Sequence, residues 1–121
     1  MKKRLLIGAA ALSLLGVLGS GIAGAAPAPS YTVACVIGLN TTADWEHVKL
    51  SQVTFHWLAP AGNTTTTFED ATVPITAKRP RGSAFATTPP AGLDNVNPDR
   101  VVVSFTHADG SGTDTAEATC S

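Results

Sequence analysis

The chain has 121 residues, a formal charge of −1 at neutral pH and 44% hydrophobic residues. This length allows one modest domain with its own core. The mildly acidic balance argues against general nucleic-acid binding, which needs a clustered positive face.

The first 25 residues have the pattern of a secretory signal peptide. Residues 2–4 are Lys-Lys-Arg, residues 5–22 carry no charge, and the small residues Ala23 and Ala25 follow. We therefore expect cleavage after Ala25 and a secreted, extracellular product that no longer contacts the membrane. The alternative is an uncleaved membrane anchor, because about 20 apolar residues are enough to cross a bilayer.

Cleavage would remove three of the eight basic side chains and none of the nine acidic ones, which leaves a formal charge of −4. Residues 26–30 read Ala-Pro-Ala-Pro-Ser, a short extended leader. We expect the folded domain to cover residues 31–121. Its one basic run, residues 78–81, is expected to be a solvated loop.

Cys35 and Cys120 are the only cysteines of the chain. In an oxidising compartment a disulfide between them is the natural interpretation. It would join the first predicted strand to the last and close a loop of about 84 residues, which by chain entropy stabilises a small domain by roughly 4 kcal/mol. The absence of a Cys-x-x-Cys spacing argues against a redox or metal-binding pair.

Alternation of apolar and polar residues predicts strands and essentially no α-helix. We expect strands at residues 31–39, 47–58, 64–68, 71–77, 83–87, 100–107 and 113–120. Residues 40–44 are expected to form a turn-rich connection, and residues 89–99 a loop. The last two strands form a hairpin around the turn at residues 108–112.

The predicted strand at 47–58 changes phase. Apolar residues stand at even positions up to Leu50 and at odd positions from Val53. All of them face inward only if a β-bulge near Ser51 and Gln52 inserts one residue.

Pro74 cannot donate to a strand ladder, so we expect the 71–77 strand at a sheet edge. Few charges protect such an edge, which allows weak homodimers through it. Six to seven short strands make a single antiparallel β-sandwich of two sheets.

The stretch from Asp99 to Cys120 resembles the closing hairpin of bacterial immunoglobulin-like or fibronectin-type-III-like modules. The precursor as a whole is similar to small exported proteins of high-GC Gram-positive bacteria, many of which have no assigned role. This resemblance implies an immunoglobulin-like sandwich of bacterial origin. The chain departs from the antibody pattern, because its cysteines lie on the two terminal strands, where they would tie the ends together.

Several residues are candidates for partner binding. Trp57 is expected in the core, whereas Trp45, between Asp44 and Glu46, is a candidate exposed aromatic that could stack on a sugar or a partner. The candidate set is Trp45, Lys78, Arg79, Arg81, Pro89 and Pro90.

The residues of an enzyme site are not apparent. His47, His56 and His107 occur without a His-Glu-x-x-His pair or a Gly-x-Ser-x-Gly elbow. Glu46 and His47 are neighbours, so on a strand they point to opposite faces. A simple surface pair of His107 with Asp109 is expected. A zinc site built from two or three of the histidines is the alternative.

We therefore expect no catalytic residues, no metal and no cofactor. The sequence 109–114 spaces oxygen ligands as calcium loops do, but it lacks the sixth-position Gly and the distal Glu, so a hairpin turn is preferred. Asn40 and Asn63 match the glycosylation sequon. They would carry glycans in a eukaryote and would be plain turns in a bacterium.

Two functions remain, with an enzyme kept as a third, which would need the histidines to converge in a cleft that alternation does not predict. The first is a small secreted, non-catalytic binding module or cell-envelope-associated module, whose partner is an extracellular protein or an envelope component. The alternative is a secreted low-molecular-weight inhibitor of a hydrolase or protease, which would present the loop at residues 78–92.

Overall fold

Seven strands and no helix make up residues 27–121, which are the residues that the computed structural model describes. The predicted signal peptide, residues 1–25, lies outside them. The strands are β2 Ser30–Cys35, β3 Asn40–Glu46, β4 Leu50–Leu58, β5 Ala71–Pro74, β6 Arg81–Thr87, β7 Arg100–His107 and β8 Thr113–Thr119. A helix long and apolar enough to cross a membrane is not found in this part of the chain.

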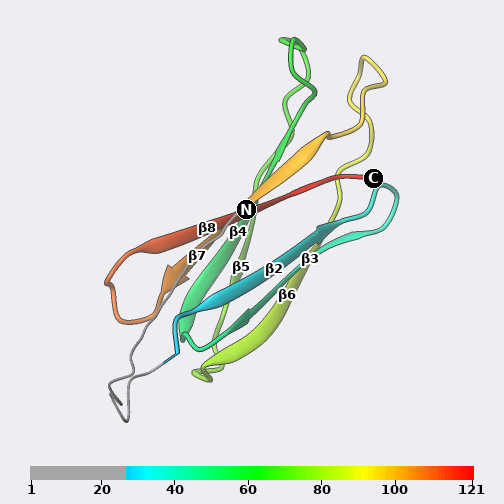
Figure 1. Ribbon diagram of the computed structural model, residues 1–121. Coiled ribbons are helices and arrows are strands. Elements are labelled where there is room, and N and C mark those ends of the chain that lie inside the picture. Colours follow the sequence, from blue (N-terminus) through cyan, green and yellow to red (C-terminus); the bar gives the residue numbers. More distant parts are fainter. Residues whose placement is uncertain (1–26) are drawn as a thin grey trace.

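The strands form two antiparallel sheets, ordered β2-β3-β6 and β5-β4-β7-β8 (Figure 1). This is the predicted β-sandwich. In chain order, β2, β3 and β6 take the places of strands A, B and E of immunoglobulin-like sandwiches, and β4, β7 and β8 take those of C, F and G. The two long connections, residues 59–70 and 88–99, extend from one end of the sandwich, at the top of Figure 1.

The core lies between the two sheets and is built on alternation. Most of its large side chains come from β4 and β7: Leu50, Val53, Phe55, Trp57, Val101, Val103 and Phe105. The register of β4 against β7 shifts between Leu50 and Gln52, which confirms the predicted bulge. The extra residue lets Leu50 and Val53 both be fully buried although their positions differ in phase.

The disulfide joins Cys35 at the end of β2 to Cys120 just after β8, with Cα atoms 4.6 Å apart. Backbone hydrogen bonds flank it, from Ile37 N to Ser121 O (2.9 Å) and from Ser121 N to Cys35 O (3.2 Å). The predicted link between the two terminal strands is thus confirmed, and it holds one sheet to the other along this side of the sandwich.

A buried group of polar side chains lies beside the disulfide. Thr41 Oγ1 accepts a hydrogen bond from Trp57 Nε1 (2.9 Å) and lies 2.8 Å from Thr88 Oγ1. It also lies 3.4 Å from Cys35 Sγ. The Thr41 hydroxyl therefore links β3 of one sheet to β4 of the other and to Thr88, which follows β6.

The expected connection at residues 40–44 was wrong, because these residues begin strand β3. Its threonines favour pleated backbone, and β3 is the central strand of its sheet, paired with both β2 and β6. Tertiary pairing overrides the turn character of this segment. The first strand in turn ends at Cys35 instead of residue 39, because Gly38 adopts a φ of 84° in the turn that leads into β3.

The strand expected at residues 64–68 was also wrong. Asn63 Oδ1 accepts hydrogen bonds from the backbone N–H groups of Thr65 (3.2 Å) and Thr66 (2.8 Å). This local turn competes with a strand ladder for the same N–H groups. The next strand, β5, ends at Pro74 and pairs only with β4, so the predicted edge position is confirmed while its extent to residue 77 is not.

Candidate functional site

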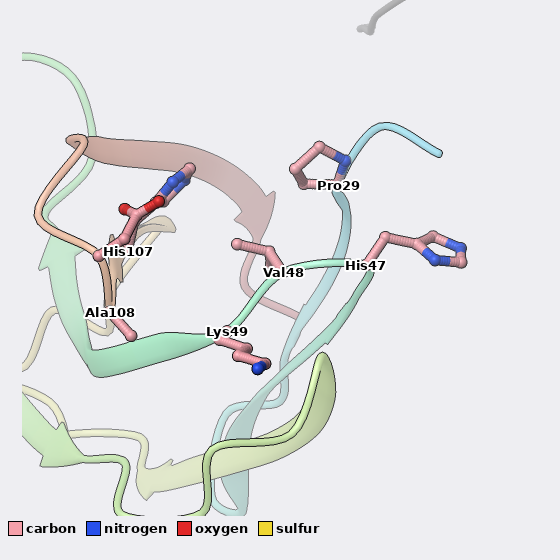
Figure 2. A pocket seen from close by; sticks show the side chains of 7 residues that line it. Pro29, His47, Val48, Lys49, His107 and Ala108 are labelled. Carbon is pink, nitrogen blue, oxygen red and sulfur yellow. The ribbon is translucent and has the colours of Figure 1, made fainter. Parts of the chain in front are cut away.

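A hollow of about 490 Å³ lies at the end of the sandwich where β3 passes into β4. Its lining residues are Pro29, His47, Val48, Lys49, His107, Ala108 and Asp109. The two imidazole rings do not converge, because the His47 ring points away from His107 (Figure 2). Among residues 27–121 there is no group of three His, Cys, Asp or Glu side chains placed to hold a metal ion.

His47 is held differently from the expectation. Its φ is 66°, which turns the chain at the end of β3, and its Nε2 lies 3.7 Å from Glu46 Oε1. The expectation that these neighbours point to opposite faces assumed a continuous strand, whereas β3 ends at Glu46 and His47 has a positive φ. The third histidine, His56, lies apart, exposed on β4 with its Nδ1 2.5 Å from Asp70 Oδ1.

His107 belongs to a hydrogen-bonded network at the β7–β8 hairpin. Its Nε2 lies 2.9 Å from Asp114 Oδ2 and its Nδ1 lies 3.0 Å from Ser111 Oγ. Tyr31, from β2, donates its hydroxyl to the same Asp114 oxygen. The expected pairing of His107 with Asp109 was wrong, because Asp109 turns back to accept the backbone N–H of Ser111 (2.9 Å). The 109–114 segment thus consists of the preferred hairpin turn and the first two residues of β8.

This network has the order Ser, His, Asp that serine hydrolases use, but with the two imidazole nitrogens exchanged. Two backbone N–H groups of this turn are already engaged, Gly110 N with His107 O (3.2 Å) and Ser111 N with Asp109 Oδ1 (2.9 Å). The network ties the hairpin to β2. Burial, and then the Asp114 carboxylate, raise the pKa of Tyr31 above its usual range, so it remains a phenol donor.

A second hollow, which we call the β5–β6 cleft, lies between the edges of the two sheets. Strand β5 pairs only with β4 and strand β6 only with β3, so each turns an unpaired edge to this side. The cleft measures about 250 Å³. Its lining residues are Trp45, Val73, Pro74, Ile75, Thr76, Ala77, Arg81, Gly82 and Ser83.

Trp45 forms the inner wall of the β5–β6 cleft. The alternative that it is an exposed aromatic on a loop is wrong: it occupies an inward position of β3 and is only 3% exposed. Its ring meets Phe105 edge to face, with centroids 6.4 Å apart, and lies against Gly82, where a Cβ would come within 2.6 Å of Trp45 Cζ2. Only glycine leaves room for the indole across this strand pair.

The two tryptophans differ in one polar atom. Trp57 Nε1 donates to Thr41 Oγ1, whereas the buried Trp45 Nε1 has no acceptor among residues 27–121. A buried N–H without a partner costs about 1–3 kcal/mol, and such groups are rare in folded proteins. Trp45 therefore brings a buried, unsatisfied donor to the residues that line the cleft.

Positive charge gathers at the mouth of the β5–β6 cleft. Arg81 lines it, and Lys78 and Arg79 are exposed on the connection that leads to it. Three of the five basic residues after residue 25 lie in this segment. Within the described part of the chain none of the three forms an ion pair, and Glu46, opposite Arg81 in the register, lies against His47.

The structure brings together only part of the candidate set. Trp45 and Arg81 share the cleft, and Lys78 and Arg79 border it, but Pro89 and Pro90 follow the other end of β6, about 20 Å away at strand spacing. The loop expected at residues 78–92 is correspondingly interrupted, because residues 81–87 form β6. Pairing with β3 explains this difference.

The two sequons differ in their surroundings. Asn40 is exposed at the start of β3, whereas the side-chain amide of Asn63 donates to Asp94 Oδ2 (3.0 Å). Thr65 and Thr66 also donate to Asp94, and these hydrogen bonds hold the pKa of its carboxyl well below its usual range. Asp94 thereby joins the 59–70 connection to the 88–99 connection.

No protein-family profile, curated protein or solved structure matches this chain significantly. The features of the chain that bear on its function are therefore the β5–β6 cleft and the charges around it.

Proposed function

We propose that the protein is a small secreted, non-catalytic module that binds an extracellular protein or a component of the cell envelope through its β5–β6 side. The buried, unpartnered Nε1 of Trp45, a residue that lines the cleft, is the observation that carries this proposal. A partner that supplies an acceptor would remove a cost of about 1–3 kcal/mol and so would be bound more tightly.

Two further features support the proposal. The disulfide Cys35–Cys120 suits an oxidising compartment outside the cytoplasm, in agreement with the predicted signal peptide. The basic side chains of residues 78–81 stand out on a domain whose formal charge after cleavage is −4, so they would steer an acidic partner to this side.

Site-specific photo-crosslinking tests this function. A photoreactive residue replaces Thr76, in the cleft, or Thr115, which is exposed on β8 as a matched control. The mature oxidised protein is then incubated with intact cells and culture fluid of the organism that produces it. We expect a discrete crosslinked product from position 76 only. Equal products from both positions, or none from either, would contradict binding through this side.

The inhibitor is a second candidate, and one contact favours it. The exposed segment Lys78–Pro80 is held at its end by the hydrogen bond from Val48 N to Pro80 O (3.2 Å). A basic segment that the domain fixes in this way can bind in the active-site cleft of a protease and stay bound there. Trypsin activity would then fall reversibly with added protein, and Arg79→Ala together with Arg81→Ala would abolish the effect. Rapid cleavage of this segment would end the inhibitor proposal.

A further inference from the structure

Strand β6 offers an unpaired edge to the β5–β6 cleft. It has seven residues, and β3 is its only strand partner. The strand across the cleft, β5, is four residues long and ends at Pro74, which lacks a backbone N–H. A free strand edge beside a cleft is the arrangement to which an extended peptide adds as a further strand.

Trp45, which lines the cleft, has an indole N–H that lacks a hydrogen-bond acceptor among the residues that the structure describes. Trp45 Nε1 is bonded to Cε2, and the Cε2–Cζ2 edge of the indole is the part of the ring that lies nearest Gly82 of β6. The buried Nε1 is thus bonded to the ring edge that faces β6, and Trp45 is one of the residues that line the cleft. An indole nitrogen can only donate, and the carbonyl groups of an extended peptide are acceptors spaced along its length.

The basic side chains at the mouth of the cleft would attract a negatively charged ligand. Arg81 lines the cleft with Lys78 and Arg79 beside it, and none of them is ion-paired within residues 27–121. Between these charges and Trp45 the lining is largely apolar, with Val73, Pro74, Ile75 and Ala77. This order fits a segment that has small apolar side chains and one carboxylate.

The size of the cleft also favours a peptide. Its volume of about 250 Å³ is smaller than the roughly 300–1,000 Å³ typical of sites for drug-sized ligands and cofactors. A short piece of extended chain fits such a space, and the rest of the strand would continue along β6.

We infer that the β5–β6 cleft binds an extended, acidic peptide segment of a partner protein. The segment adds to the free edge of β6, one of its carbonyl groups accepts from Trp45 Nε1, and its carboxylate pairs with Arg81. This inference rests on the proposed binding function and names the chemistry of the partner.

The experiment uses an array of synthetic seven-residue peptides, matched to the length of β6, with alternating Thr and Val and one Glu at each position in turn. A second array carries Gln at the same positions. We expect binding that is about threefold to tenfold tighter for the best Glu peptide than for its Gln counterpart, as a charge-assisted hydrogen bond would give. Equal binding of the two arrays, or no binding, would overturn the inference.

Heteronuclear NMR then locates the best peptide on the mature oxidised protein. The two tryptophans give two indole N–H signals, and we expect the Trp45 signal to move downfield on titration while the Trp57 signal, already bonded to Thr41, stays in place. Movement of both signals, or of neither, would contradict the site. A Trp45 signal that shifts on dilution without peptide would show that a second copy of the chain occupies the cleft instead.

Two matched substitutions complete the test. Arg81→Gln should remove the preference for Glu over Gln, whereas Arg100→Gln, an exposed arginine paired with Glu117 (3.1 Å) in the other sheet, should keep it. Loss of the preference in both variants would contradict a specific role of Arg81. If peptides fail while position 76 still gives a crosslink, the peptide inference falls and the binding function stands. If position 76 gives none, the proposed function itself falls.

Discussion

The two tryptophans of the sandwich differ in whether a buried acceptor lies within reach of the indole N–H. Thr41 Oγ1 is the acceptor for Trp57 Nε1 and the neighbour of Thr88 Oγ1. Thr41→Val keeps the shape but leaves both groups without this partner, so we expect a loss of about 1–3 kcal/mol in the free energy of unfolding, measured by urea denaturation. Thr42→Val, on the other face of β3, should change it little. A Thr41→Val protein as stable as the parent would show that the buried group is dispensable.

The only tyrosine of the chain, Tyr31, reports on the hairpin network. Its pKa is raised by burial and by Asp114, so the folded state retains a proton that the unfolded state releases above about pH 10. Stability should therefore fall as the pH rises through that range and be unaffected by this group below it. Absorbance of the phenolate should appear together with unfolding. Tyr31→Phe should remove this part of the alkaline instability; phenolate in a protein still folded at pH 10 would contradict the burial.

At the scale of elements, the pairing of β3 with β6 depends on the fit of Trp45 over Gly82. A methyl group at residue 82 would come within 2.6 Å of the indole. We expect Gly82→Ala to destabilise the fold by about 1–3 kcal/mol through overpacking, and to alter Trp45 fluorescence. Thr87→Ala, exposed on the same strand, is the control. Thermal unfolding followed by circular dichroism measures both, and equal melting temperatures would mean that the ring moves aside without cost.

The elements also show what local pattern can and cannot predict. The β7–β8 hairpin, the bulge after Leu50 and the edge position of Pro74 follow from short-range rules on alternation, turn residues and a missing donor. Strand β3 was missed because its Asn, Thr and Asp residues resemble a turn, and only its two neighbouring strands decide otherwise. The place of Trp45 beside the cleft depends on its burial against β6, which its neighbours in the sequence do not predict.

At the scale of the whole molecule, the disulfide between the terminal strands constrains the unfolded chain over a sequence separation of 85. Its reduction should lower the free energy of unfolding by about 2–5 kcal/mol, measured by urea denaturation with and without reductant. A double Cys35→Ala and Cys120→Ala variant should melt like the reduced protein. Unchanged melting after reduction would remove the structural role of this bond.

The pairing of two cysteines was predictable from their number alone, whereas the β5–β6 cleft was not. It arises where edges of different sheets face each other, and no local pattern encodes the distance between Val73 and Gly82. The basic residues at 78–81 were visible in the sequence, but the indole N–H behind them was not. Sites built between sheets therefore emerge only when the strand order is known.

The link between Cys35 and Cys120 also decides how the domain carries mechanical load. Tension applied at the two ends of the folded domain passes through the disulfide, whose two Cα atoms are 4.6 Å apart. The segment between Cys35 and Cys120 therefore carries no load. Only β2 ahead of Cys35 can peel away, and because a strand already rises about 3.3 Å per residue, its release adds little to the length of the chain. The oxidised domain should thus behave under pulling as a nearly inextensible unit, while the reduced domain unravels strand by strand.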